Sequence, residues 1–521
     1  MKKTYAFALT AGLFLLGSCA ANEPEINPGA DVDTSGAGYI NFAFTHSTDT
    51  RADGDAEEEA IGIETADFLF YAADGRYLGV QSVKADQNDL NAKWISTPSH
   101  TVADNQVDLC VALKVPFAEA YSVTVILNKG NVSITSSQNQ IATNPVSGNN
   151  YKTAKGNWVM SNAVNYGAGN RNTAQSNVAT WRVPLDKQFV YENIEAAAAA
   201  DAKAAATVNV ERTVAKMEIT ASSTCFTKSG DDLIATIGSS NFGATGEATG
   251  TIYEIEFTPT NAYATNTPNQ GALIKQLPAY TLLDAKEKSF IYAGRTSLCA
   301  PHADATLTNW TLSDLATNKK GESLFTDNVR YVYDNSGETG EERSATAVAL
   351  VGKYNVYKTQ DGTRTLIAGA DHETVKDFYL MGVGDVWRVF TDEKALLTAM
   401  GATQTTTTLK KQMRNGKWTG YMELDGEETP YVCMKYSGGH GYYTRYIELA
   451  KEGDKVYSYV TRNHKYQIEI NKIEGMGIGI PDGNTPIEPI DPPKPNDKSF
   501  YMHISVNVVD WIAVPKQSVN W

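Results

Sequence analysis

The sequence is poor in the residues that build metal sites and disulfide frameworks, because its 521 residues include only 7 histidines and 5 cysteines. Basic residues are also in the minority, with 45 Lys and Arg against 60 Asp and Glu, and the formal charge is -15. An acidic surface repels phosphate groups, so this balance argues against nucleic-acid binding. We expect no nucleic acid among the partners, no metal site and no cofactor.

The motifs of the common enzyme classes are absent as well, since the chain contains no HExxH, GxSxG or GxxxxGK[ST]. The glycine run 475–479 precedes a proline and not a helix, which disfavours a dinucleotide site. We interpret His440, and the pair His302 and Asp304, as loop residues. The segment 53–55 lacks the spacing of a calcium loop. The sequence therefore predicts a protein that is not an enzyme and has no catalytic residue.

The apolar run at the N-terminus, residues 6–16, is too short to span a bilayer, which takes about 20 residues. It follows two lysines and has the length of a signal-peptide core. It ends in Leu16-Gly17-Ser18-Cys19, a pattern typical of a bacterial lipoprotein cleavage site. We expect residues 1–18 to be a lipoprotein signal peptide and Cys19 to carry the lipid. An ordinary secretory signal followed by a chance cysteine is the alternative.

The remaining cysteines are Cys110, Cys225, Cys299 and Cys433. We expect them to be buried free thiols, and one or two disulfide bridges remain open in an exported protein. No segment after residue 16 is long and apolar enough to cross a membrane. The mature chain is therefore expected to be lipid-anchored or exported, not membrane-spanning.

Short apolar runs with period-two alternation, separated by Gly, Pro, Asn and Asp, predict β-strands. The candidate strands are residues 39–44, 68–70, 109–115, 121–127, 181–185, 457–460, 466–470 and 502–508. Helix signals are few: residues 196–206 are a short helix or a linker, and residues 392–400 form a helix capped by Thr391 or Asp392. The pattern predicts an all-β protein of two antiparallel β-sandwich domains with few short helices.

Composition shifts along the chain suggest a domain division. We expect a propeptide over residues 19–51, with a polar tether and the first strand, an N-terminal domain over 52–207 and a C-terminal domain over 208–521. The apolar phase changes between Val214 and Met217, which indicates a bulge or a change of facing surface. The Gly- and Pro-rich residues 474–499 read as a semi-rigid spacer that carries a terminal strand over 500–521.

Four local patterns occur in a characteristic order. The first is the lipoprotein signal followed by a strand and then by Arg51 in a polar loop, and the others are residues 209–216, 462–477 and 506–514. Together they resemble the fimbrillin family of Bacteroidota, the subunits of type V pili. The last two are most similar to the shaft subunit of short (Mfa-type) fimbriae. The middle of the second domain matches no such pattern, so a shaft, accessory or tip subunit stays open.

The resemblance implies transthyretin-like sandwiches and a route of assembly. Such subunits reach the outer membrane as lipoproteins, and a trypsin-like surface protease cuts them after an arginine, here between Arg51 and Ala52. The cut would release the first strand, whose inward residues are Ile40, Phe42 and Phe44. The vacated groove would accept the terminal strand of another copy by strand addition. The donor residues would be Ile504, Val506, Val508, Trp511, Ile512 and Val514.

The resemblance also implies partners and a location. The partners would be other copies of the chain, accessory fimbrial subunits, the protease, and host or bacterial receptors. The precursor would lie at the cell outer membrane and the mature protein in an extracellular fimbrium that supports adhesion. One alternative is a non-polymerising surface lipoprotein that binds glycan or host protein through its Tyr and Trp residues. An exported hydrolase is a third hypothesis.

Overall fold

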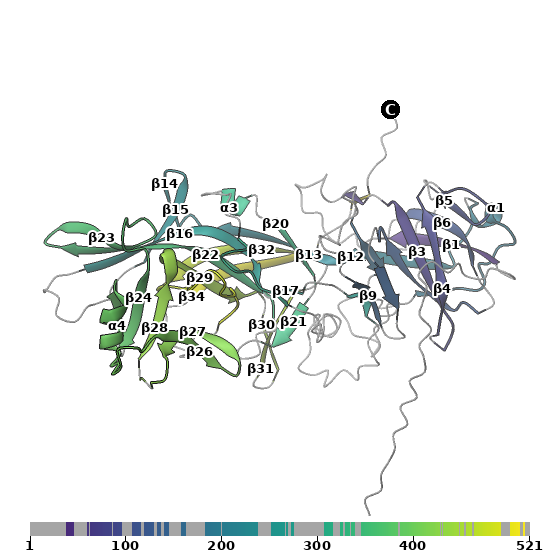
Figure 1. Ribbon diagram of the computed structural model, residues 1–521. Helices are drawn as coiled ribbons and strands as arrows, with labels where there is room; N and C mark the ends of the chain where they lie inside the picture. The colour runs from purple at the N-terminus through teal and green to yellow at the C-terminus, as the bar shows by residue number, and fades with distance from the viewer. Residues whose placement is uncertain are drawn as a thin grey trace, which may run out of the picture.

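The computed structural model is built almost entirely of β-strands, which confirms the all-β prediction. Figure 1 shows two groups of sheets, called here the first lobe (purple to blue) and the second lobe (teal to yellow). Within the described part of the chain, no helix has the length and apolar character needed to cross a membrane. The structure describes residues 38–45, 60–95, 107–144, 158–162, 183–199, 201–237, 252–275, 307–315, 323–338, 345–383, 386–447, 449–490, 501–510 and 514–515, with gaps of one to three residues inside several of these ranges.

The first lobe is formed by strands in the order β4-β3-β7-β10-β12-β1-β6-β5, with β11 paired to β7. Their bounds are β1 (Gly38–Thr45), β3 (Thr65–Tyr71), β4 (Tyr77–Lys84), β5 (Ala92–Ile95), β6 (Val107–Val115), β7 (Ser122–Leu127), β10 (Met160–Asn162), β11 (Val183–Pro184) and β12 (Ala206–Arg212). The first half of β12 pairs with β1 and its second half with β10. Strand β12 therefore passes from one layer of a sandwich to the other.

Side-chain contacts show that this sheet folds over on itself. Strands β1 and β3 are not neighbours in the sheet, yet Phe42 of β1 lies 4.7 Å from Phe68 of β3 between ring centroids. The two rings belong to a buried cluster that also contains Ile40, Phe44 and Trp158. The apolar alternation of the first strand therefore packs its inner face into the centre of the first lobe.

The second lobe contains three larger sheets. One has the order β20-β13-β32-β34, a second β14-β15-β16-β22-β29-β33 with β23 paired to β22, and a third β25-β24-β28-β27-β26. Their bounds are β13 (Val214–Ala221), β14 (Thr227–Ser229), β15 (Asp232–Ile237), β16 (Ile252–Thr265), β20 (Val329–Tyr333), β22 (Ala347–Gln360), β23 (Thr363–Gly369), β24 (Phe378–Val383), β25 (Val386–Phe390), β26 (Leu409–Arg414), β27 (Lys417–Leu424), β28 (Val432–Tyr436), β29 (His440–Tyr446), β32 (His464–Glu474), β33 (Ile478–Gly479) and β34 (Tyr501–Asp510).

Short elements complete the described chain. They are β2 (Ala60–Ile61), β8 (Ser133–Ser136), β9 (Gln140–Asn144), β17 (Thr267–Pro268), β18 (Ala272–Lys275), β19 (Leu307–Thr308), β21 (Asn335–Glu338), β30 (Leu449–Glu452), β31 (Lys455–Val460), β35 (Val514–Pro515), α1 (Ile194–Ala197), α3 (Ser323–Thr326), α4 (Glu393–Ala399) and a 3-10 turn η1 (Ser437–Gly439). The predicted helix is α4, in which Asp392 Oδ1 accepts a hydrogen bond of 2.8 Å from the Ala395 amide. The alanine-rich stretch contributes only α1 and its flanking turns.

The chain passes between the lobes at the residue where the apolar phase changes. Val214 belongs to the buried cluster of the first lobe, whereas Ala215 and Met217 belong to that of the second. The predicted change of facing surface is therefore confirmed. The domain division at residue 207 stays a prediction, and the pairing of β12 within the first lobe favours a boundary after Arg212.

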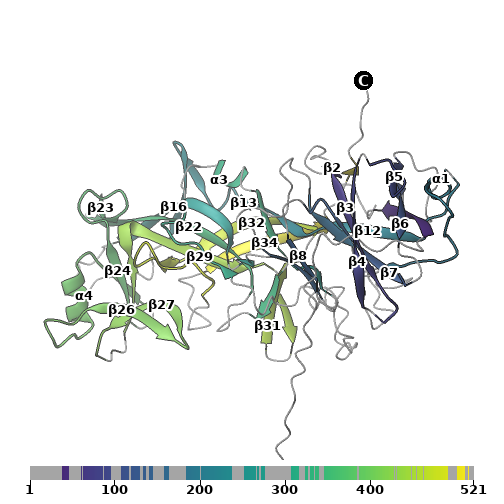
Figure 2. The same ribbon diagram turned by 45° about the vertical axis from the view of Figure 1, so that its right-hand side comes forward.

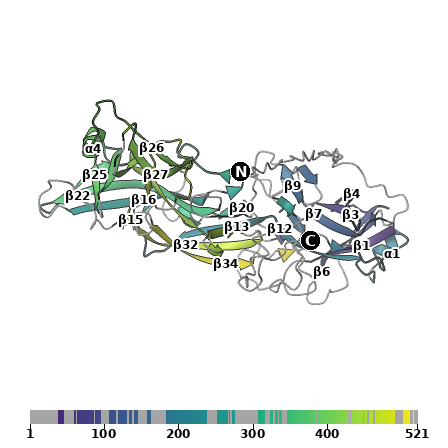
Figure 3. The same cartoon turned by 90° about the horizontal axis from the view of Figure 1, so that it is seen from below.

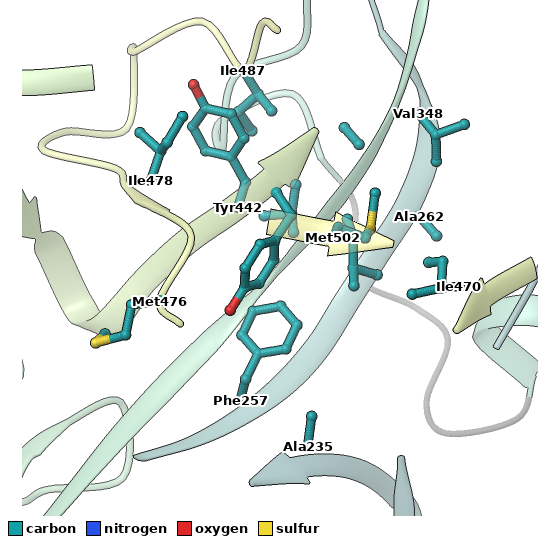
Figure 4. Packing of buried hydrophobic residues seen from close by; sticks show 14 of the residues in the cluster. Ala235, Phe257, Ala262, Val348, Tyr442, Ile470, Met476, Ile478, Ile487 and Met502 are labelled. Carbon is teal, nitrogen blue, oxygen red and sulfur yellow. The ribbon is translucent and has the colours of Figure 1, made fainter. Parts of the chain in front are cut away.

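The glycine run 475–479 packs against buried tyrosines. The Tyr436 hydroxyl donates to the Gly477 carbonyl at 2.6 Å, and the Gly477 amide donates to the Tyr354 hydroxyl at 3.0 Å. Ile480, Ile487 and Ile490 continue into the same buried cluster, part of which appears in Figure 4. This differs from the spacer expected over 474–499, because the apolar side chains of this segment are buried as far as residue 490.

Candidate functional site

The first strand occupies an interior position in its sheet. Strand β1 pairs antiparallel with β6, from Gly38 opposite Val115 to Thr45 opposite Val107. Its other edge pairs parallel with β12, from Phe42 opposite Ala206 to Thr45 opposite Asn209. Removing β1 would leave unpaired backbone groups on both neighbours, and such edges are templates for another strand. We call the position between β6 and β12 the β1 slot.

Both faces of β1 are buried. Ile40 and Phe42 are 0 % exposed and Phe44 is 2 % exposed on the face that meets the first core. Phe44 also lies 6.0 Å from Phe68 between ring centroids. On the opposite face Asn41 is 1 % exposed and Ala43 is 0 % exposed. A strand that occupies the slot must therefore have side chains that pack on both of its faces.

Residues 191–199 and 201–205, which we call the alanine-rich cover, bond to the β12-side edge of β1 through their backbone and lie over its outer face at Ala197 and Ala204. The amide of Tyr191 donates to the Tyr39 carbonyl at 2.8 Å, and the Tyr39 amide donates back at 3.1 Å. The Asn41 side-chain amide donates to the Ala197 carbonyl at 3.0 Å. The Ala205 amide donates to the Asn41 carbonyl at 2.8 Å. Small alanine side chains let the cover approach the strand closely enough for these bonds.

Sequence reasoning missed this outer face. Asn41 and Ala43 alternate with the apolar residues and look solvent-facing, because the residues that bury them come from later segments. The Ala197 carbonyl that Asn41 meets lies 156 positions later, and Ala43 packs against Ile95 and Ala204. A signal was present in the asparagine between Ile40 and Phe42, since asparagine is depleted in strands and needs hydrogen-bond partners when buried.

Several predicted site residues lie outside the described part of the chain. They are the lipidation residue Cys19, the cleavage pair Arg51 and Ala52, and the donor residues Trp511 and Ile512. Strand β1 ends at Thr45 and the next described residue is Ala60. Any cut between residues 51 and 52 therefore separates β1 from every later strand.

The terminal strand β34 lies at the edge of its sheet. It pairs antiparallel with β32, with Val506 opposite Ile468. Figure 2 and Figure 3 show it beside β32, with no strand label of its own sheet on the other side. Met502 is buried in the second core, whereas Ile504 and Val506 are only half-buried. The strand is therefore held by its own subunit less completely than β1 is.

The end of the chain differs from the expected continuation of the terminal strand through residue 514. Strand β34 ends at Asp510, and Val514 belongs to β35, where it pairs with Ala60 of β2 in parallel. The donor residues Ile504, Val506 and Val508 thus share one strand, while Val514 lies in another.

The remaining polar candidates have structural surroundings. His440 is the first residue of β29, its Nδ1 lies 3.0 Å from the Ser437 carbonyl, and burial lowers its pKa. Cys225 and Cys433 are free thiols, as predicted, but only Cys433 is fully buried. His302 and Cys299 lie outside the described residues, as does the segment 53–55, and Cys110 is placed only by its backbone in β6. Among the residues described, no group of three or more acidic, His or Cys side chains is placed to hold a metal.

Comparison with known proteins gives one family match. Residues 434–517 match the model described as "Major fimbrial subunit protein type IV, Fimbrillin, C-terminal". This range takes in β29, β32 and the terminal strand β34. No curated protein matches the chain.

Two solved structures from Parabacteroides distasonis are distantly similar. A "putative cell adhesion protein" is 13% identical, with a TM-score of 0.34 and coverage of 91% of this chain and 99% of that one. A fimbrial assembly protein is 11% identical, with a TM-score of 0.24 and coverage of 64% and 99%. These scores are too low to carry the fold assignment, which rests on the strand pairing. The resemblance to fimbrillins is thus confirmed by the family model over residues 434–517.

Proposed function

We propose that this protein is a structural subunit of a cell-surface fimbrium that polymerises by strand exchange and supports adhesion. It is exported as a lipoprotein through Cys19, cut between Arg51 and Ala52 by a trypsin-like protease, and joined to the next subunit when a terminal strand fills the β1 slot. The precursor lies at the outer membrane and the mature subunit lies in the filament. Accessory subunits and host or bacterial receptors are its further partners.

One observation carries the proposal: the first strand of the described chain lies in the interior of its sheet. A single cut after this strand would remove its covalent link to the strands that follow. Burial of Ile40, Phe42 and Phe44 stabilises the strand by roughly 1.5–3 kcal/mol each. A strand held this firmly does not leave at random. Its replacement needs a competitor and a change that weakens its hold.

Cutting at Arg51 supplies that change without altering any contact in the slot. While the chain is intact, the covalent connection to β2 keeps β1 at a high effective concentration beside its slot, because its return is intramolecular. After the cut, a strand that leaves the slot diffuses away with its lipid. Terminal strands of neighbouring subunits can then compete for the slot, because β1 no longer returns to it intramolecularly.

The terminal strand is a suitable competitor. It presents Ile504, Val506 and Val508 at alternate positions, as β1 presents Ile40, Phe42 and Phe44. It lies at a sheet edge, so it can detach without breaking a sheet in two. The residues between Ile490 and Tyr501 give it a tether of at most about 3.3–3.6 Å per residue. The contact is head-to-tail, and such contacts build open filaments.

The test combines three versions of the protein. Arginine-specific proteolysis of the wild type should shorten the chain at Arg51 and give ladders on electrophoresis and filaments by electron microscopy. Arg51→Ala should remain uncut and monomeric. A truncation after Lys498 should be cut and still remain monomeric. Polymerisation of the truncated protein would exclude strand donation by this tail.

The same experiment separates the proposal from its alternative. A non-polymerising surface lipoprotein that binds glycan or host protein would adhere equally well with Arg51→Ala and would form no filaments in any version. Loss of filaments together with loss of adhesion in Arg51→Ala supports the fimbrial role.

A further inference from the structure

The β1 slot has two unlike positions on its covered face. At position 41 an amide side chain reaches the Ala197 carbonyl, which lies under the alanine-rich cover. At position 43 the side chain is alanine, 0 % exposed, and it packs against Ala204 and Ile95. The first position fits a hydrogen-bonding amide, and the second admits only a small side chain.

The terminal strand carries two polar residues between its three apolar ones, in the order Ile504-Ser505-Val506-Asn507-Val508. If it enters in the direction of β1 with Ile504 at position 40, then Ser505 falls at position 41 and Asn507 at position 43. The asparagine is then forced into the tight alanine site, and the shorter serine faces the Ala197 carbonyl. A large polar side chain without a partner is costly when buried.

The opposite direction removes both conflicts. With Val508 at position 40, Asn507 takes position 41 and Ser505 takes position 43, while Val506 and Ile504 take the places of Phe42 and Phe44. The series apolar, amide, apolar, small, apolar then matches β1 at every position. A direct shift that sets Asn507 at position 41 instead places Asp510 at position 44, in the core, where a carboxylate is disfavoured.

We propose that the terminal strand of a second copy enters the β1 slot in the direction opposite to β1, and that Asn507 and Ser505 determine this register beneath the alanine-rich cover. The inference rests on the proposed strand exchange and specifies its geometry. The incoming strand runs antiparallel to β12 and parallel to β6, the reverse of β1 in both cases. The single amide under the cover selects the register, as buried polar residues do in other assemblies.

Two substitutions distinguish the directions by rate. In the proposed register Ser505→Ala is neutral, because position 43 already holds alanine in the precursor. Asn507→Ala removes the hydrogen bond to a buried carbonyl and slows polymerisation about tenfold. Insertion in the direction of β1 gives other results, and each of them overturns the inference. With Ile504 at position 40 the ranking is reversed, and Asn507→Ala is neutral or faster. With Met502 at position 40 both substitutions are neutral, because Ser505 takes position 43 and Asn507 lies beyond position 44. Thermal melting of each uncut monomer shows whether a variant has simply lost stability.

Crosslinking shows which residue of the incoming strand lies at position 43, and the Asn507→Ala rate then gives its direction. Position 43 lies opposite Cys110 of β6 and Thr207 of β12. With Cys225, Cys299 and Cys433 replaced by serine, protease-treated Ser505→Cys should form intersubunit disulfides with Cys110. Ser505→Cys should likewise form intersubunit disulfides with a cysteine introduced by Thr207→Cys when Cys110 is replaced by serine. Asn507→Cys should form at least several-fold fewer in both backgrounds, because its position is displaced by two residues.

The outcomes are separable from those of the proposed function. Filaments with preferred crosslinking of Asn507→Cys, or filaments with neither crosslink, overturn the reversed register while strand exchange stands. Absence of filaments from the wild-type protein after cutting at Arg51 overturns the proposed function itself.

Discussion

The rings of Phe42 and Phe68 lie 4.7 Å apart across the two layers of the first lobe. In the intact chain they belong to one core. Under the proposed processing they part, because Phe42 leaves with the first strand and Phe68 stays in β3. Substitutions of the two residues can therefore be compared, because both lie in the core of the precursor but only Phe68 would remain in the filament.

We expect Phe42→Ala to destabilise the precursor by about 3–5 kcal/mol, as truncation of a fully buried phenylalanine does. After proteolysis and polymerisation the substituted residue is gone, so the filament should melt at the wild-type temperature. Phe68→Ala is the control and should lower the melting temperature of both forms. A Phe42→Ala filament that melts as early as its precursor would show that β1 remains in the slot.

The inner face of β1 could be predicted from the sequence, because the alternation of apolar and other residues is a local pattern. Ile40, Phe42 and Phe44 show this pattern within five residues. The outer face could not be predicted, since the Ala197 carbonyl that Asn41 meets comes from a distant segment whose composition suggests a helix or linker. The burial of residues 475–490 could not be predicted from the sequence for a related reason. Glycine and proline suggest a spacer, but here the glycines let the backbone reach the hydroxyls of Tyr354 and Tyr436.

Gly477 should be intolerant of substitution. A Cβ atom at this position would lie 2.2 Å from the Tyr442 carbonyl oxygen and 3.0 Å from the Tyr354 hydroxyl. Both are held in the buried core, so the backbone must shift to admit it. We expect Gly477→Ala to lower the free energy of unfolding of the second lobe by about 1–3 kcal/mol or more, measured by urea denaturation.

Gly230→Ala is the control for that substitution. Its positive φ of 60° strains any L-residue, but no atom lies within 4 Å of the added Cβ. The cost there should be about 1 kcal/mol, from backbone conformation alone. Because Gly477 has no positive φ, a loss there no larger than at Gly230 would mean that the contacts of the added Cβ with Tyr442 and Tyr354 cost no more than backbone strain alone.

The buried tyrosines predict a loss of stability at alkaline pH. Burial is the first cause that raises the pKa of Tyr354 and of Tyr443 above the ordinary 10.0. Each hydroxyl therefore stays neutral in the folded protein at a pH where it ionises in the unfolded chain. Stability is fully present below pH 10 and falls as the pH rises above it, by about 1.4 kcal/mol per pH unit for each such group.

Urea denaturation between pH 8 and pH 11 measures this slope. Tyr443→Phe removes one of these groups. It should lower the free energy of unfolding at pH 8, because the hydrogen bond to the Gly475 carbonyl is lost. It should also make the fall of this free energy above pH 10 less steep, by the contribution of one proton. An unchanged slope would contradict the assignment of that group. Tyr121→Phe is the control, because Tyr121 is 50 % exposed and outside these contacts.

The two described thiols should differ in reactivity for reasons of burial. Burial, followed by the nearby carboxylate of Glu393, raises the pKa of Cys433 to about 12, and burial raises the pKa of Cys225 to about 11. At pH 8 both thiols are therefore almost entirely protonated in the folded protein, which slows their reaction with maleimide. We expect maleimide to label Cys225 at least tenfold faster, because Cys433 is also covered by α4 and its neighbours.

Labelling in a Cys110→Ser, Cys299→Ser background, followed by mass spectrometry of peptides, measures both rates in one sample. In urea above the unfolding transition the two rates should become equal, since both thiols then have the same surroundings. Fast labelling of native Cys433 would show that α4 opens on the timescale of the reaction. Because neither thiol belongs to the first lobe, both rates should be unchanged by cutting at Arg51, and a change would show that processing loosens the second lobe as well.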